Sequence, residues 1–152
     1  MTDKPPQDEA IEAQSAPPAD MRTLDRLVGR WQITGDAEGT ATYEWMDGGF
    51  FLIQHVDMTL QGHQVKVTEI IGHLQPFGEE PSQDIWSRAY DSKGFTFDYV
   101  YEMQQDTLMI WGGERGSPAY FKGTFSADGD TNTGAWVFSR GGGYSTTMTR
   151  MR

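Results

Sequence analysis

The side chains with the clearest potential for chemistry are an arginine and four aromatic residues on two neighbouring predicted strands. Trp86 and Tyr90 flank Arg88 at i−2 and i+2, so these three side chains share one face of a strand. Tyr99 and Tyr101 share one face of the next strand. If both faces point inward, Arg88 would hold a ligand carboxylate through two N–H bonds while the rings cover its apolar part. If they point outward, Arg88 is a solvated charge within an aromatic surface stripe.

An arginine inside the protein requires a carboxylate or an anionic ligand, because an unpaired buried charge is costly. The acidic residues Glu69, Asp98 and Glu102 are the candidate internal counter-ions. His55 lies on a long strand next to that of Glu69, and we add both to the candidates. The candidate ligand-binding residues are therefore Arg88, Trp86, Tyr90, Tyr99, Tyr101, Glu69 and His55.

The three histidines are candidates for a metal site or a general base, but their positions argue against a metal. His63 follows Gly62 in a predicted turn, where a solvated side chain is expected. A tight turn there pairs positions whose numbers sum to about 125, which sets His55 opposite Ile70 and leaves Glu69 on the other face. A metal cluster that joins His55 to Glu69 is thereby disfavoured. We expect neither a metal nor a cofactor.

The elements that carry these residues are predicted strands. After Gly29, runs of β-branched and aromatic residues alternate at short, regular intervals with clusters of Gly, Asp, Asn and Ser, a pattern typical of all-β proteins. Short links of this kind make neighbouring strands antiparallel. The predicted strands cover residues 31–34, 39–46, 50–60, 64–74, 84–90, 94–103, 107–112, 119–126, 133–139 and 144–151.

The N-terminal residues have a different composition. Residues 1–20 contain four of the seven prolines and several acidic residues, so we expect an acidic, Pro-rich, disordered tail. Leu24, Leu27 and Val28 then follow helical spacing, with Asp20 as the predicted N-cap and Gly29 as the stop. Residues 21–152 are expected to form a single domain. One short helix cannot cover so many strands, which favours an antiparallel up-and-down barrel of nine or ten strands.

A short helix, then Gly29-Arg30-Trp31, then meandering strands resembles the calycin superfamily of lipocalins and fatty-acid-binding proteins. The resemblance implies a calycin-like barrel closed at one end by Trp31, with an arginine of the last strand packed on the tryptophan. Arg150 is the first candidate for that arginine and Arg152 the second. A closer resemblance is to the bacterial domain of unknown function 1579, carried by Leu27-Val28-Gly29-Arg30-Trp31, Thr42-Tyr43-Glu44-Trp45, Gly48-Gly49-Phe50-Phe51-Leu52, Glu69-Ile70-Ile71-Gly72, Ile110-Trp111-Gly112 and the segment 123–130.

Composition excludes several classes of function. The 152 residues carry a formal net charge of −10, which repels nucleic acid and anionic membrane surfaces. The absence of cysteine excludes disulfides and thiolate chemistry. No basic start with an apolar run is present, and no apolar stretch approaches the roughly 18 residues of a membrane span. We therefore expect a cytoplasmic protein without nucleic-acid or membrane partners.

Three functions remain open from the sequence. The first is binding of a small amphipathic or aromatic molecule, including a carboxylate, in the barrel lumen. The second is a metal-independent enzyme of the lyase or isomerase type in the same barrel, with tyrosines and an Arg/Glu set acting on a bound acid. The third is a structural domain with a filled core that acts through its outer surface, for example as a homodimer.

Overall fold

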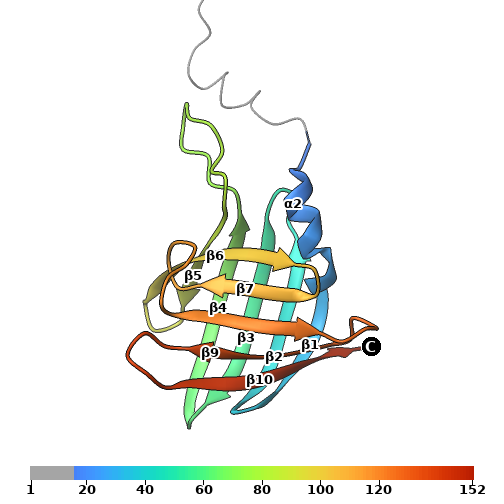
Figure 1. Ribbon diagram of the computed structural model, residues 1–152, viewed down its shortest axis with the longest axis vertical. Coiled ribbons are helices and arrows are strands. Elements are labelled where there is room, and N and C mark those ends of the chain that lie inside the picture. The colour runs from blue at the N-terminus through green and yellow to red at the C-terminus, as the bar shows by residue number, and fades with distance from the viewer. Residues whose placement is uncertain (1–15) are drawn as a thin grey trace, which may run out of the picture.

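The structure, a computed structural model that describes residues 16–152, is a closed antiparallel β-barrel of ten strands (Figure 1). Each strand pairs with its neighbours in the chain, and β1 pairs with β10 to close the barrel. This confirms the predicted all-β, up-and-down fold. The strands are β1 (Gly29–Gly35), β2 (Ala37–Trp45), β3 (Leu52–Leu60), β4 (His63–Gly72), β5 (Ile85–Asp91), β6 (Thr96–Gln104), β7 (Thr107–Trp111), β8 (Tyr120–Phe125), β9 (Thr131–Val137) and β10 (Gly143–Met151).

The predicted helix is present as one α-helical turn, α2 (Ala19–Arg22), followed by a 3-10 helix, η1 (Thr23–Leu27). Its start differs from the prediction, because Pro18 rather than Asp20 occupies the N-cap position and no side chain caps the helix. The Asp20 carboxylate instead lies 2.8 and 2.9 Å from Nε2 of His73. Ala19 and Asp20 therefore belong to the folded domain, and residues 1–15 of the predicted tail lie outside the described residues.

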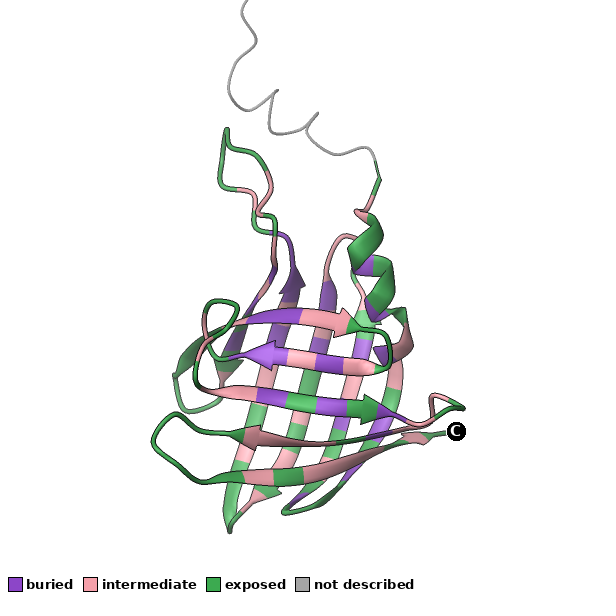
Figure 2. Ribbon diagram, viewed as in Figure 1, coloured by how far each residue is buried: buried purple, intermediate pink, exposed green. Residues whose placement is uncertain are grey.

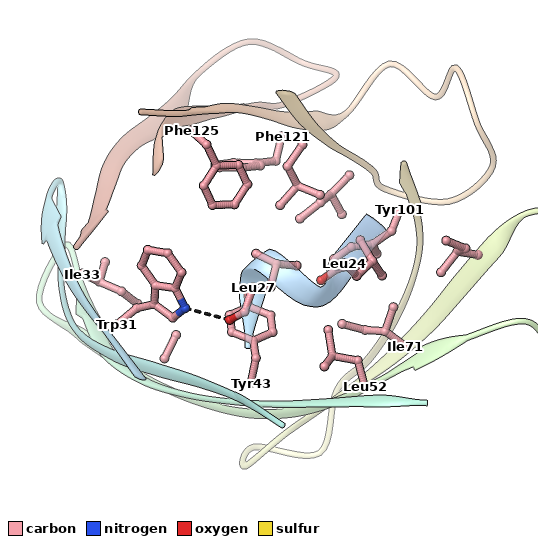
Figure 3. Close-up of a cluster of buried hydrophobic side chains, with 14 of the residues drawn as sticks. Leu24, Leu27, Trp31, Ile33, Tyr43, Leu52, Ile71, Tyr101, Phe121 and Phe125 are labelled. Carbon is pink, nitrogen blue, oxygen red and sulfur yellow. Dashed lines mark hydrogen bonds between the residues drawn. The ribbon is translucent and has the colours of Figure 1, made fainter. Parts of the chain in front are cut away.

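The helical segment closes one end of the barrel. Met21, Leu24 and Leu27 are fully buried in the main hydrophobic core. Figure 3 shows Leu24 and Leu27 within the ring of strands, surrounded by side chains from several of them. The backbone oxygen of Leu27 also accepts a 2.8 Å hydrogen bond from the indole N–H of Trp31. Apolar burial and this bond together fix the helix across the barrel end.

Arg150 and Trp31 form the contact that the family resemblance implied. The guanidinium carbon of Arg150 lies 4.3 Å from the ring centroid of Trp31, and the tryptophan is fully buried. The same guanidinium donates hydrogen bonds to the backbone oxygens of Val28 (2.7 Å) and Arg26 (2.9 Å) and contacts Asp130 (3.2 Å). The last strand is thereby tied to the junction between η1 and β1.

Burial changes from residue to residue along many of the strands (Figure 2), because successive side chains of a strand point to opposite faces. The β3–β4 hairpin fixes which residues face each other. Gln61 and Gly62 both have positive φ, 51° and 81°, which is typical of a two-residue type I′ turn. Leu60 therefore pairs with His63, and His55 faces Thr68 rather than the predicted Ile70. The predicted register is wrong by two residues, whereas the predicted separation of His55 and Glu69 onto opposite faces is confirmed.

Two facing glycines let a phenyl ring lie against the inside of the barrel wall. Gly123 of β8 pairs with Gly134 of β9. A Cβ added to either one would lie 2.7 Å from Cζ of Phe121, closer than carbon atoms normally approach. A side chain at these positions would therefore displace the Phe121 ring.

Candidate functional site

The barrel encloses an open cavity of about 500 Å³. Leu60, Val65 and Phe138 line it near the hairpins at the end opposite the helix. Tyr43 and Tyr101 line its deep end, and Figure 3 places both beside the helical segment. Most of the lining is aliphatic or aromatic. The core is therefore not packed solid, and the lumen has room for a small molecule.

Polar side chains gather at the deep end of this cavity, and we call them the lumen floor. Tyr43, Gln54, Glu69 and Tyr101 line the cavity there, and Ser87 contacts Glu69 from the barrel wall. Tyr43, Gln54 and Glu69 are paired across β2, β3 and β4. The Gln54 amide donates a 2.7 Å hydrogen bond to the Tyr43 hydroxyl. Ser87 and Tyr101 both donate to Oε2 of Glu69, at 2.5 and 2.8 Å. In the described part of the chain, Oε1 of Glu69 has no hydrogen-bond partner.

The electrostatic state of the floor is set by the burial of Glu69. Only 4% of this residue is exposed, and burial raises its pKa, against the opposing effect of the hydrogen bonds from Ser87 and Tyr101. Burial also raises the pKa of Tyr101, and the Glu69 charge raises it further. A carboxyl of raised pKa that has one oxygen without a partner is suited to bind a polar ligand group or to transfer a proton.

Aromatic rings form one wall of the cavity. Ring centroids are separated by 6.4 Å from Phe97 to Tyr99, 5.6 Å from Tyr99 to Trp136 and 5.7 Å from Trp136 to Phe121. All four residues line the cavity. We call them the aromatic wall. Such neighbouring tilted rings offer π faces and edges to an apolar or aromatic ligand.

The structure separates the predicted site residues into two groups. Tyr99, Tyr101 and Glu69 line the lumen. Arg88 lies outside, with 57% of its side chain exposed, because Ser87 and Ala89 on either side of it point inward. Its predicted position within the lumen is therefore wrong.

Trp86 and Tyr90 share the outer face with Arg88, so the prediction that they surround a lumen site is also wrong. The guanidinium pairs with the facing Asp98, with distances of 2.7 and 3.0 Å. Arg88, Trp86 and Tyr90 line a separate hollow of about 470 Å³ on the outside of the barrel, together with Ile70.

His55 lies outside the lumen and its ring nitrogen Nδ1 contacts Thr68 Oγ1 at 3.1 Å. His73 is buried and bridges Asp20 and the backbone oxygen of Ser82. Among the described residues, no group of three or more His, Asp or Glu side chains is arranged to hold a metal ion. None of the helices in residues 16–152 has the length and apolar character needed to cross a membrane.

Gln54, Tyr43 and Ser87 belong to the floor but were not predicted. A signal for Gln54 was present in the sequence, because it interrupts the inward row Leu52, Val56, Met58 and Leu60 with one polar residue. The signal for Ser87 was the alternation of β5 itself, since choosing the inward face of that strand selects Ser87 instead of Arg88.

No protein-family model matches the chain, and no curated protein matches it. Among solved structures, the barrel is similar to one described as the de novo design of a fluorescence-activating β-barrel, with 12% sequence identity and a TM-score of 0.44. The match covers 85% of this chain and 97% of the designed one.

Proposed function

We propose that this protein binds a small amphipathic molecule, with an apolar or aromatic body, in the barrel lumen. The observation that carries the proposal is the open cavity of about 500 Å³ that ends on the lumen floor. Binding sites for small molecules are commonly cavities of this size, mostly apolar, with a few polar groups that orient the ligand. The aromatic wall would cover the ligand body, while Glu69 and Gln54 would receive its polar end.

The position of Arg88 changes the expected ligand class. A ligand carboxylate was expected because an inward arginine would bind it. Arg88 lies outside and is already paired with Asp98, whereas the lumen floor carries the acid Glu69. The proposed ligand therefore has a polar group that donates hydrogen bonds.

A second candidate function is metal-independent proton transfer on a bound molecule. It is favoured by one observation, namely a buried carboxyl of raised pKa beside the Tyr101 hydroxyl. Carboxyls of raised pKa in apolar sites are typical general acids and bases. The Arg/Glu set expected from the sequence does not form in the lumen, so Glu69 and Tyr101 would act without an arginine. Recovery of a bound compound unchanged by mass spectrometry would favour binding over catalysis.

We also propose that the barrel belongs to the calycin superfamily and is related to the domain of unknown function 1579. The contact between Arg150 and Trp31 supports this proposal, since it joins the Gly29-Arg30-Trp31 motif to the last strand. Cytoplasmic location and homodimer formation stay predictions.

Nile red, a neutral dye whose fluorescence rises in apolar surroundings, provides the test of lumen binding. Thr146→Trp would fill part of the lumen, because Thr146 lines the cavity and tryptophan is much larger than threonine. Thr149→Trp is the matched control, since it makes the same change on an exposed position of the same strand. We expect saturable binding that Thr146→Trp weakens at least about tenfold and Thr149→Trp leaves unchanged. Equal binding by both folded variants would contradict a lumen site.

A further inference from the structure

We propose that the ligand of the lumen is an organic cation, a protonated amine carried on an aromatic body, with its ammonium group at Glu69. This inference rests on the proposed function and narrows it to one chemical class. It is carried by three observations on the lumen: the sign of its charges, the hydrogen-bonding groups left without partners on its floor, and the rings of its wall.

Among the described residues that line the cavity, the acidic and basic side chains are all carboxyl groups. Glu69 lies on the floor and Asp91 also lines the cavity, whereas no lysine, arginine or histidine is found among the described residues that line it. The whole chain carries a formal net charge of −10, which adds a field of the same sign. A cation is attracted into this lumen, and a carboxylate is repelled from it.

Two acceptor oxygens on the floor are open to donors from the ligand. Oε2 of Glu69 already accepts from Ser87 and Tyr101, which leaves Oε1 without a partner in the described residues. Gln54, directly opposite Glu69, uses its amide N–H to bind Tyr43, so its carbonyl oxygen is also left without a partner there. An ammonium group has three N–H donors and no acceptor, which matches two neighbouring acceptors.

The groups that face Glu69 contain no cation that would neutralise it. They are Tyr43 on β2, Gln54 on β3, Ser87 on β5, and Tyr99 and Tyr101 on β6, while η1 contributes buried leucines. Burial accordingly raises the Glu69 pKa. A bound ammonium would supply the missing positive partner and so favour the ionised carboxylate.

The wall completes a site for an aromatic cation. Tyr99, Trp136 and Phe121 line the lumen. The ring centroid of Trp136 lies 5.6 Å from that of Tyr99 and 5.7 Å from that of Phe121. Their π faces attract a cation and also pack against an aromatic body. A carboxylate combined with several aromatic rings is a common way for proteins to recognise organic ammonium groups.

The test is a series of three naphthalene compounds that differ in charge, titrated into the full chain at pH 7 by calorimetry. They are 2-(2-naphthyl)ethylamine (a cation), 2-(2-naphthyl)ethanol (neutral) and 2-naphthylacetate (an anion). We expect the amine to bind at least about tenfold more tightly than the alcohol, and the acetate more weakly than both. Equal affinities, or preference for the alcohol or the acetate, would overturn the inference.

Glu69→Gln then tests whether Glu69 causes the preference for the amine over the alcohol. We expect the ratio of amine to alcohol affinity to fall to about one in this variant, because the amide has no negative charge to attract the ammonium. Asp57→Asn is the matched control, since it removes the same charge from an exposed position outside the lumen and is expected to keep the ratio. An unchanged ratio in Glu69→Gln would overturn the inference.

Nile red binding separates this inference from the proposed function. If Nile red binds to the lumen and is displaced by the alcohol but not by the amine, lumen binding stands and the cation inference fails. If Nile red and all three naphthalenes fail to bind, the proposed function itself fails. Should Glu69→Gln not fold, as judged by circular dichroism, the charge series on the natural chain still decides the inference.

Discussion

Arg150→Ala is expected to lower the free energy of unfolding by about 2–4 kcal/mol, because one guanidinium joins several parts of the barrel. It lies 4.3 Å from the Trp31 ring centroid, a contact worth about 0.5–2 kcal/mol. It also donates to the backbone oxygens of Arg26 and Val28, and each such charged bond contributes about 1.5–3 kcal/mol. The Arg150 side chain is 22% exposed, so solvent screening reduces the sum of these contributions to roughly half.

Urea unfolding followed by circular dichroism measures this loss. Arg152→Ala is the matched control, because Arg152 contacts the same Asp130 but is 73% exposed, so solvent screens the contact and we expect little loss of stability. Arg150→Lys keeps the positive charge but lacks the planar guanidinium that donates to the backbone oxygens of Val28 and Arg26. We therefore expect it to retain only part of the stability that Arg150→Ala loses. If Arg150→Ala and Arg152→Ala destabilise the protein equally, the role given to the Arg150–Trp31 contact is refuted.

Three further predictions test other parts of the structure. The pKa of Glu69 is raised in the folded protein, so the protonated carboxyl favours folding. This stabilisation is fully present at a pH below the pKa of Glu69 in the unfolded chain, and it is lost as the pH rises through the pKa in the folded protein. Glu69→Gln should remove this pH dependence, which amounts to at most about 1.4 kcal/mol of unfolding free energy per pH unit. Urea unfolding at several pH values measures it, and an equal change of unfolding free energy with pH in both proteins would contradict the prediction. Gly123→Ala should cost about 1–3 kcal/mol because its Cβ would meet Oδ1 of the buried Asn132 and the Phe121 ring. Gly112→Ala, whose Cβ has ordinary contacts, should be nearly neutral by thermal melting. Arg88→Met should leave Nile red affinity unchanged, and a weakened affinity would place the dye on the outer face instead.

The order and type of the elements could be predicted because local residue types determine them. The Gly- and Asp-containing turns separate the ten strands, and one short helix could not cover them, so closure into a barrel followed. The Trp31 closure came from the family resemblance. Asp20 was predicted as an N-cap from its residue type, but the structure uses it to bind His73, a partner 53 residues away in the chain.

The inward face of each strand could not be predicted, because alternation alone does not say which parity points inward. Trp86, Arg88 and Tyr90 look like a site in sequence, yet the register of β5 with its neighbours places Ser87 and Ala89 inside. The sequence analysis placed the larger side chains of this strand, and not the small ones, inside the barrel. Small side chains at the inward positions are what leave the lumen open.

The hairpin register was missed for a related reason. A two-residue turn at Gln61 and Gly62 and a longer turn are both compatible with the local sequence, and they shift the pairing by two positions. A shift of two preserves which face each residue occupies. The separation of Glu69 from His55 was therefore predicted correctly even though the partner of His55 was not.

A crystal structure of the protein with 2-(2-naphthyl)ethylamine would show directly whether Glu69 binds an ammonium group in the lumen. We expect the naphthalene ring in the lumen against Trp136 and the ammonium nitrogen about 3 Å from Oε1 of Glu69. A compound seated in the outer hollow beside Arg88, or a lumen left empty at saturating concentration, would contradict it.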